Sequence, residues 1–342
     1  MRGATLVSLP AFMAGVIAAS LNIYALSAGA DFGGGIWDLL ATGPRRDKQR
    51  TLIADAIGPI WEANHVWMIL VVVLLFTAFP PAFALLMTIL HVPITLMLFG
   101  IVLRGSSFTF RSYDSRRDVV QRRWGRIFAI ASTATPLLLG CIIGTIATGV
   151  LRSTQVELDA AYVQVYVRPW LRPFPVGVGV LALALFSFLA AVYLTVEAKE
   201  DALREDFRTR ALLASVAVAA IALLDLVLAR SSAPLVWSEL TEGSVATLLR
   251  AGAALAALGA MVGLWRRNYA AARIAAIIEV SFVVWGWALG QFPYLVPPDV
   301  TIDGAAAPSL TLRLLAIALF VGLVLLAPSL RYLYRVFKKT AG

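Results

Sequence analysis

The sequence has little of what disulfide-linked proteins and metalloproteins depend on. It contains one cysteine, Cys141, and two histidines among 342 residues. A single cysteine excludes an intrachain disulfide, and it leaves no cysteine pair for an iron–sulfur cluster or a zinc finger. We expect Cys141 to be a buried apolar thiol without a chemical role.

Charge is also scarce. Only 14% of the residues are charged, 60% are hydrophobic, and the mean hydropathy is +0.83. No segment between apolar runs is longer than about 25 residues, which leaves no room for a separate soluble domain. Phosphate-binding Gly-Lys-Ser/Thr loops and dinucleotide fingerprints are absent. The sequence therefore predicts a membrane protein whose chemistry takes place within the bilayer or in a partner.

Nine apolar runs are long enough to cross a bilayer as helices, which takes about 20 residues each. The predicted fold is an all-α polytopic membrane protein, and we expect its first helix to be retained rather than cleaved as a signal peptide. The expected spans are 8–30, 54–79, 82–103, 125–150, 174–197, 211–229, 249–265, 271–295 and 309–330.

The basic residues predict the orientation of these spans. If the N-terminus lies outside, one side of the membrane holds 22 of the 29 Lys and Arg residues. Basic loops remain in the cytoplasm, so the C-terminus is predicted to be cytoplasmic. The net charge of +9 is explained by this asymmetry and by contact with anionic lipid, and we expect no nucleic-acid partner.

Ionisable residues inside the second span are the first candidates for function. Asp55, Glu62 and His65 are seven and three residues apart, so in one helix they would share a face. With Asp31, they form a predicted proton path from the cytoplasm, because ionisable groups at membrane depth commonly serve proton transfer. The alternative is a structural network in which Arg104 forms an ion pair with Glu62 or Asp31.

The two histidines raise a second hypothesis. His65 and His91 flank the predicted hairpin turn at Phe79-Pro80-Pro81 almost symmetrically, at about 13 residues each way. On adjacent antiparallel helices they would reach a similar depth, which is the geometry of a bis-histidine haem site. Two ordinary hydrogen-bonded interior histidines are the alternative.

Two further segments have distinct composition. The glycine-rich stretch from Ala28 to Trp37 is expected to end the first helix and to let backbones pack closely. Near the other end of the chain, Trp285, Gln291 and Tyr294 lie in an aromatic and proline-rich segment, which either anchors the helix at the interface or contacts a quinone or a partner. Glu279 is a buried acid that either extends the proton route or pairs with Arg273 or another chain.

Four ordered motifs resemble subunit II of the cytochrome bd terminal oxidases, and the resemblance extends over nearly the whole chain. The motifs are Gly29-Ala-Asp-Phe-Gly-Gly-Gly35, Ile57-Gly-Pro-Ile-Trp-Glu-Ala-Asn-His-Val-Trp67, Leu98-Phe-Gly-Ile-Val-Leu-Arg-Gly-Ser-Ser-Phe-Thr-Phe-Arg111 and Gly290-Gln-Phe-Pro-Tyr-Leu-Val-Pro-Pro-Asp-Val-Thr-Ile302.

This resemblance implies a haem-free subunit in a heterodimer with a haem-bearing subunit I. The partner would hold haems b and d and the quinol site, and this chain would bind neither a cofactor nor a metal. Glu62 matches the acid of the family's Trp-Asp-Gly-Asn motif in the proton route. Trp67 matches the tryptophan near the proposed oxygen path, and Arg104 matches the arginine that closes the third span. A small third subunit and a structural quinone or lipid stay open.

Three positions depart from the family pattern. Glu62 replaces the usual aspartate, and His65 stands where glutamine or glutamate is common. Ala28 occupies a position that is acidic in many members. These departures leave the details of the proton route open.

The resemblance also implies an arrangement within a single membrane domain, 1–342. Residues 1–150 and 174–295 would form two four-helix bundles, and 309–336 a peripheral ninth helix with the cytoplasmic tail. Two functions compete. One is an accessory subunit of a quinol:O2 oxidoreductase of the bacterial inner membrane, which stabilises subunit I and leads protons and oxygen to its haems. The other is a stand-alone proton-coupled transporter.

Overall fold

The computed structural model describes residues 8–57, 61–113, 118–152 and 161–339, and only the backbone at 57, 61–63, 111–113, 118–122 and 333–339. Nearly all of it is helical. The elements are α1 (Leu9–Leu39), α2 (Arg46–Ile57), α3 (Trp61–Ala78), α4 (Pro80–Ile89), α5 (His91–Tyr113), α6 (Asp118–Ala147), α7 (Tyr162–Tyr166), η2 (Arg168–Leu171), α8 (Pro173–Glu197), α9 (Asp201–Ser232), α10 (Pro234–Thr241), α11 (Gly243–Trp265), α12 (Tyr269–Gly290), β1 (Tyr294–Val296), β2 (Val300–Thr301) and α13 (Ser309–Lys339).

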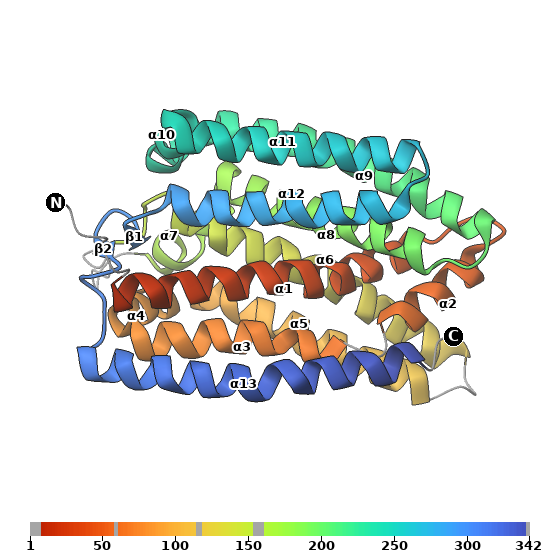
Figure 1. Ribbon diagram of the computed structural model, residues 1–342, viewed down its shortest axis with the longest axis horizontal. Coiled ribbons are helices and arrows are strands. Elements are labelled where there is room, and N and C mark those ends of the chain that lie inside the picture. The colour runs from red at the N-terminus through yellow and green to blue at the C-terminus, as the bar shows by residue number, and fades with distance from the viewer. Residues whose placement is uncertain (1–7, 58–60, 114–117, 153–160, 340–342) are drawn as a thin grey trace.

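The long helices lie side by side along one axis (Figure 1). The short helices α4, α7 and α10 and the β1–β2 hairpin gather at one end, here called the α10 end. Helix α2 and the C-terminus lie at the opposite end, called the α2 end. Within the described residues, eight helices are long and apolar enough to cross a membrane, or nine if α3 and α4 count as one bent span. The prediction of a polytopic all-α membrane protein is confirmed.

Helix α8 occupies the centre of the fold and packs against α1, α6, α9 and α12. Its side chains Phe188 and Leu189 are fully buried in a core that also includes Phe32 of α1 and Val280 of α12. Helix α13 packs mainly on α1 and α3, and most of its described side chains are exposed. Exposed apolar side chains are expected on helices that face lipid or a partner chain.

The glycine-rich stretch does not end the first helix, contrary to the prediction. Helix α1 continues through Gly33 to Leu39. Each interior glycine costs a helix about 1 kcal/mol relative to alanine. The cost is offset here because the backbones of α1 and α8 approach closely, so that a Cβ on Gly33 would collide with the carbonyl group of Phe186. The predicted role of these glycines in close packing is therefore confirmed.

Replacement of Gly33 by alanine is expected to lower the free energy of unfolding by about 2 kcal/mol, because the obstructing atoms belong to the α8 backbone and cannot rotate away. Gly15 is the matched control, since no atom lies within 4 Å of a Cβ built there. Gly15→Ala should be neutral or slightly stabilising. Thermal denaturation of the purified protein measures both, and equal stability of the two variants would contradict this packing.

The boundaries of the second and third spans also differ from the prediction. The expected helix 54–79 corresponds to the end of α2 and to α3, with residues 58–60 outside the described chain, and the expected helix 82–103 is divided into α4 and α5. Helix α4 begins at the proline pair and is bent by 117° relative to α3. Proline removes backbone hydrogen bonds, so the chain changes direction there instead of crossing the membrane in one straight helix. The third span is α5, nine residues further along the chain than expected.

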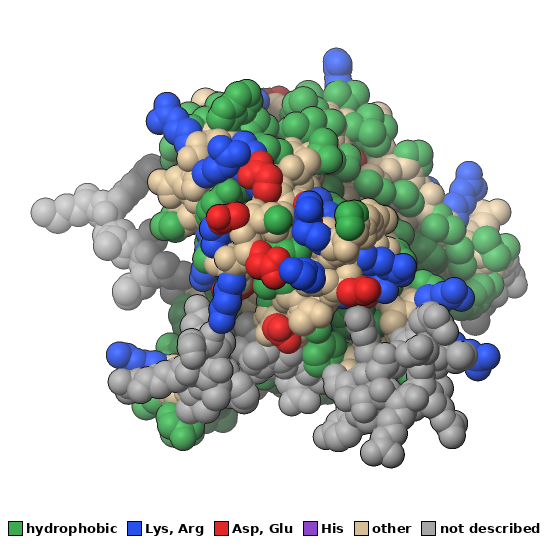
Figure 2. All heavy atoms as spheres, turned by 90° about the vertical axis from the view of Figure 1, so that its right-hand side faces the viewer, with side chains coloured by type: hydrophobic (Ala, Val, Ile, Leu, Met, Phe, Trp, Pro, Cys, Tyr) green, Lys and Arg blue, Asp and Glu red, His purple; other side chains and the backbone are tan. Residues whose placement is uncertain are grey.

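The α2 end carries a dense set of charged side chains of both signs (Figure 2). Arg45 forms an ion pair of 2.5 Å with Asp206 of α9, which also accepts a hydrogen bond of 2.9 Å from Gln49 of α2. Lys48 pairs with Glu200 at 2.8 Å. Beneath them, Ile53 packs against Leu194 and Phe207. These contacts fix the polar helix α2 against the ends of α8 and α9.

Candidate functional site

The site begins with one side of α1. Asp31 is 4% exposed, although it lies in an apolar helix, and Phe32 beside it is 1% exposed. Tyr24, two turns earlier, is also buried. Residues seven apart in a helix share a face, so Tyr24 and Asp31 project in the same direction. The continuity of α1 through its glycines holds all three groups on one rigid element.

Helix α3 brings the second motif to this face. Asn64, in its first turn, is 2% exposed and donates a hydrogen bond from Nδ2 to Oδ2 of Asp31. A buried carboxyl group requires such partners because its desolvation is otherwise costly. This bond joins the glycine-rich motif of α1 to the tryptophan-flanked motif of α3, which are 33 residues apart in sequence.

Arg104 of α5 belongs to the third motif. At 1% exposure, it is among the largest fully buried side chains. Its guanidinium lies over the rings of Phe32 and Phe128, at 4.7 and 5.3 Å from their centroids. Neither Nε nor Nη2 has a hydrogen-bond partner among the described residues. Asp31 and Tyr24 are close enough for its positive charge to act on them, and no direct ion pair joins Arg104 to Asp31.

His65 completes the group. Its half-buried ring lies with its centroid 6.1 Å from that of Tyr24 and 6.2 Å from that of Phe32. We call Tyr24, Asp31, Asn64, His65 and Arg104 the polar cluster. A carboxyl group and an imidazole beside a fixed cation can accept and release protons at membrane depth. The sequence named Asp31 and His65 as members of a proton path and Arg104 as an ion-pair partner, and the structure brings these three side chains into one cluster. It did not identify Tyr24.

Two acids of the predicted proton path are placed differently. Glu62 lies in the first turn of α3, but its side chain is outside the described residues. Asp55 is exposed on α2. The prediction that Asp55, Glu62 and His65 share one helix face falls partly outside the described side chains, but Asp55 is exposed whereas His65 is half-buried against Tyr24 and Phe32. Asp55 is therefore not a member of the polar cluster.

The bis-histidine hypothesis is contradicted. His91 begins α5 at the α10 end, whereas His65 is near the start of α3 at the opposite end. The 13 residues from His65 to the end of α3 span about 20 Å of helix. The ring nitrogens of His91 instead lie 2.9 Å from the Thr88 carbonyl oxygen and 2.8 Å from the Tyr162 hydroxyl. The equal-depth argument failed because α4 intervenes between the two helices.

The remaining predicted residues lie away from the polar cluster or on its border. Trp67 packs beside the core that contains Tyr24 and Phe32. Trp285 is half-buried near the end of α12, Gln291 is buried just after it, and Tyr294 is half-buried in β1. These three residues therefore mark the α10 end.

Two further acids are buried in the second half of the chain. Glu279 of α12 is 4% exposed, and it has no ion pair with Arg273, whose guanidinium lies 5.4 Å from the Tyr193 ring centroid. Asp225 of α9 is 5% exposed, and sequence reasoning missed it. The signal was present, since it interrupts the apolar run 211–229. Within the described part of the chain, no group of three or more His, Cys, Asp or Glu side chains could hold a metal ion.

Comparisons with known proteins agree on one family. A family model described as "Cytochrome bd terminal oxidase subunit II" matches residues 9–337. The Bacillus subtilis (strain 168) protein named "Putative cytochrome bd menaquinol oxidase subunit II" is 25% identical over 327 residues, covering 93% of this chain and 92% of that protein. The "Cytochrome bd-I ubiquinol oxidase subunit 2" of Escherichia coli (strain K12) is 27% identical over 175 residues, covering 50% of this chain and 44% of that protein.

A solved structure shares the fold. The bd oxidase from Geobacillus thermodenitrificans includes a chain that superposes with a TM-score of 0.74 at 21% sequence identity, covering 96% of this chain and 98% of that one. Together with the family model, this match confirms the resemblance seen in the four motifs. The comparisons give no support to the transporter hypothesis.

Proposed function

Because the chain belongs to the cytochrome bd terminal oxidase subunit II family, we propose that it stabilises a haem-bearing subunit I and leads protons from the cytoplasm toward the haems of that subunit. Membership makes the chain a multi-pass membrane subunit of a quinol oxidase, which is an oxidoreductase of the respiratory chain. The observation that carries the proposal is the polar cluster, in which buried groups from three of the four family motifs meet.

The proposed location is the bacterial inner membrane, with the N-terminus outside and the C-terminus cytoplasmic. The α2 end then faces the cytoplasm. This orientation is supported by the excess of basic residues in the loops of that side and by the charged surface at the α2 end. The termini of the described chain lie at opposite ends of the bundle, as an odd number of spans requires.

Two four-helix bundles, 1–150 and 174–295, with 309–336 as a peripheral ninth helix and tail, are the proposed arrangement of the domain. The exposure of α13 and its limited packing on α1 and α3 support the peripheral position. The extensive packing of α8 on both α1 and α6 means that the two bundles would share a broad interface.

The proposed proton path enters from the α2 end. Asp55 is an exposed acid on that side, Glu62 lies in the first turn of α3, and Asp31 and His65 lie deeper in the polar cluster. Arg104 would stabilise whichever carboxyl group is ionised, since a fixed cation lowers the cost of a buried negative charge. Trp67, at the border of the same core, is the proposed oxygen-path residue.

The proposed partner is subunit I, which would carry haems b and d and accept electrons from a quinol. This chain would then hold no haem. A small third subunit, and a quinone or lipid contact at Trp285, Gln291 and Tyr294, belong to the same proposal. The half-buried aromatic rings at the α10 end are suited to a membrane interface.

The test is a reduced-minus-oxidised optical spectrum of the purified complex, followed by subunit separation and haem staining. Haem is expected only with a co-purifying second subunit. His65→Ala and His91→Ala should leave the spectrum unchanged, because neither side chain is placed to ligate a shared haem. Haem retained by this chain, or loss of a haem band in either variant, would contradict the proposal.

A further inference from the structure

Buried polar groups continue along α1 from the polar cluster toward the α2 end. Asp38 is the penultimate residue of α1 and is 3% exposed. Asp31 and Asp38 are seven residues apart, so they lie on the same face of α1, about 10 Å apart along its axis. Asp38 is therefore a second buried acid on the face that carries Asp31, and it lies nearer to the end of the bundle.

A hydroxyl group of α6 lies against α1 between these two acids. Gly35 follows Asp31 by four residues and precedes Asp38 by three, so it shares their face. The Oγ of Ser132 is so close to Gly35 that a Cβ added there would collide with it. Ser132 is 0% exposed, and its Oγ has no hydrogen-bond partner among the described residues. A buried hydroxyl group without a partner costs free energy, so its place between two acids calls for a reason.

The surroundings of Ser132 are continuous with the polar cluster. Phe128 lies one turn before Ser132 on α6, and its ring would also touch a Cβ added to Gly35, at 3.1 Å from Cε1. The guanidinium of Arg104 lies over this same ring. Ser132 therefore belongs to the wall of side chains that encloses Arg104, and its hydroxyl is directed at α1 rather than at lipid.

Arg50 of α2 connects Asp38 to the surface. Its Nε lies 3.7 Å from Oδ1 of Asp38, and its Nε and Nη2 each donate to the Asp38 carbonyl oxygen at 3.3 Å. The side chain of Arg50 is 29% exposed, whereas that of Asp38 is 4% exposed. One partner of this ion pair thus meets solvent while the other lies inside. An acid in this place can exchange protons with the α2 end and still face the interior.

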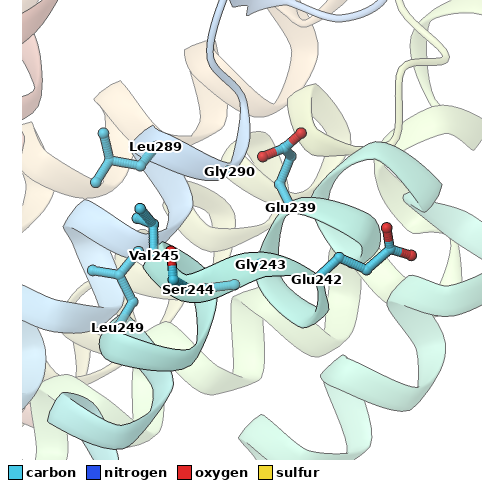
Figure 3. Close-up of a pocket in the computed structure, with 9 residues that line it drawn as sticks. Glu239, Glu242, Gly243, Ser244, Val245, Leu249, Leu289 and Gly290 are labelled. Carbon is cyan, nitrogen blue, oxygen red and sulfur yellow. The ribbon is translucent and has the colours of Figure 1, made fainter.

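The opposite end of the bundle offers no comparable connection. A pocket of about 290 Å³ opens there, where α10, the start of α11 and the end of α12 meet (Figure 3). Glu239 and Glu242 line it, but none of its lining residues in the described chain belongs to α1, α3, α5 or α6. The pocket therefore does not reach the face of α1 that carries Asp31 and Asp38.

We propose that Asp38 and Ser132 form the entrance of the proton path, so that a proton taken up at Asp38 reaches Asp31 through the Ser132 hydroxyl. This inference rests on the proposed function, because it adds two residues to that path on the side that the proposed topology places in the cytoplasm. A serine hydroxyl suits the task, since it can donate one hydrogen bond and accept another at the same time.

The transfer moves one proton and no electrons. The O–H bond of the Asp38 carboxyl group breaks, the Ser132 oxygen accepts a proton as its own proton leaves, and an O–H bond forms at the Asp31 carboxylate. The serine ends neutral, as it began. A bound water molecule bridges the gap on each side of the hydroxyl and is not consumed, since polar groups from three side chains can hold it.

Turnover of the purified complex with an excess of quinol, normalised to haem and measured in H2O and D2O, tests the entrance. Ser132→Ala removes the hydroxyl and little volume, so assembly and haem content should stay normal. Turnover should fall at least about fivefold, because the relay group is lost. The ratio of the rates in H2O and D2O should rise, because proton transfer becomes rate-limiting. Asp38→Asn should show both changes.

Thr135→Val is the matched control. Thr135 is buried on the same helix, but its hydroxyl already donates to the Ala131 carbonyl at 2.8 Å. Valine keeps the shape of the side chain and removes only this satisfied hydroxyl group. Turnover and the H2O/D2O ratio of this variant should match those of the wild type.

Two results would overturn the entrance and leave the proposed function intact. One is wild-type turnover in Ser132→Ala beside slow turnover in Asp31→Asn. The other is slow turnover in Ser132→Ala with the wild-type H2O/D2O ratio, since the hydroxyl would then be structural. If Asp31→Asn also turns over normally, the proposed proton path fails together with its entrance. Should Asp38→Asn not assemble, Ser132→Ala still decides.

Discussion

Replacement of Asp31 by asparagine is expected to slow oxygen consumption by the assembled complex at least about tenfold, because the substitution keeps the shape and removes the titratable proton. An asparagine at this position can still accept the hydrogen bond from Asn64 through its amide oxygen. Assembly and haem content should therefore stay normal. Turnover with an excess of quinol, normalised to haem, is the measurement.

Ser20→Ala is the control for this variant. Ser20 is a buried polar residue of the same helix, and its hydroxyl donates to the Val16 carbonyl at 2.8 Å, with no hydrogen bond to the polar cluster among the described residues. Turnover of this variant should match the wild type. If Asp31→Asn prevents assembly and shows no separate kinetic defect, the polar cluster is a structural network, which is the alternative that the sequence left open.

Glu62→Gln should behave like Asp31→Asn, since the family resemblance places Glu62 in the proton route. Its turnover should fall while haem content and assembly are retained. If both variants are slow and both assemble, the two acids act in series along one path. A slow Glu62→Gln variant beside a normal Asp31→Asn variant would remove Asp31 from that path.

Replacement of Arg104 by methionine is expected to lower the stability of the complex by about 3 kcal/mol, because it removes the charge that compensates a buried carboxyl group. The loss should be smaller when Asp31→Asn is already present, with a coupling of at least about 1 kcal/mol between the two positions. Thermal denaturation followed by haem absorbance, for both single variants and the double variant, measures this coupling.

Arg104→Lys separates charge from shape. Lysine keeps the positive charge but cannot lay a planar guanidinium over Phe32 and Phe128. Its stability should fall between those of the wild type and Arg104→Met. Strictly additive effects of Arg104→Met and Asp31→Asn would show that the two side chains do not interact. Arg104 would then not be the cation that stabilises the Asp31 carboxylate.

Part of the fold and of the candidate site could be predicted from the sequence, because that part depends on local properties of the chain. Hydropathy and run length indicated a polytopic helical membrane protein, since a helix must be apolar and about 20 residues long to cross the hydrocarbon region. The four motifs identified the family, and Asp31, His65 and Arg104 were recognised as candidates because ionisable groups are rare at membrane depth. None of these inferences requires knowledge of how one helix packs against another.

The predictions that failed depended on where helices end and on how they contact one another. His91 was misplaced because the proline pair starts a separate helix, α4, bent by 117° from α3. Asp55 was assigned to the buried face because hydropathy does not record that α2 lies at the charged end of the bundle, where Asp55 is exposed. The glycine stretch was expected to end α1, and only the close approach of α8 explains why the helix continues.

The sequence alone determined the class of protein, the uneven distribution of its basic residues and its family motifs, because each follows from residue type and order. Only the tertiary structure decided that Asn64 meets Asp31, that Arg104 stacks on Phe32, and that Tyr24 and Asp225 belong to buried polar groups. The physical reason is that helix packing determines how deep each side chain lies and which residues surround it. A local sequence pattern contains neither kind of information.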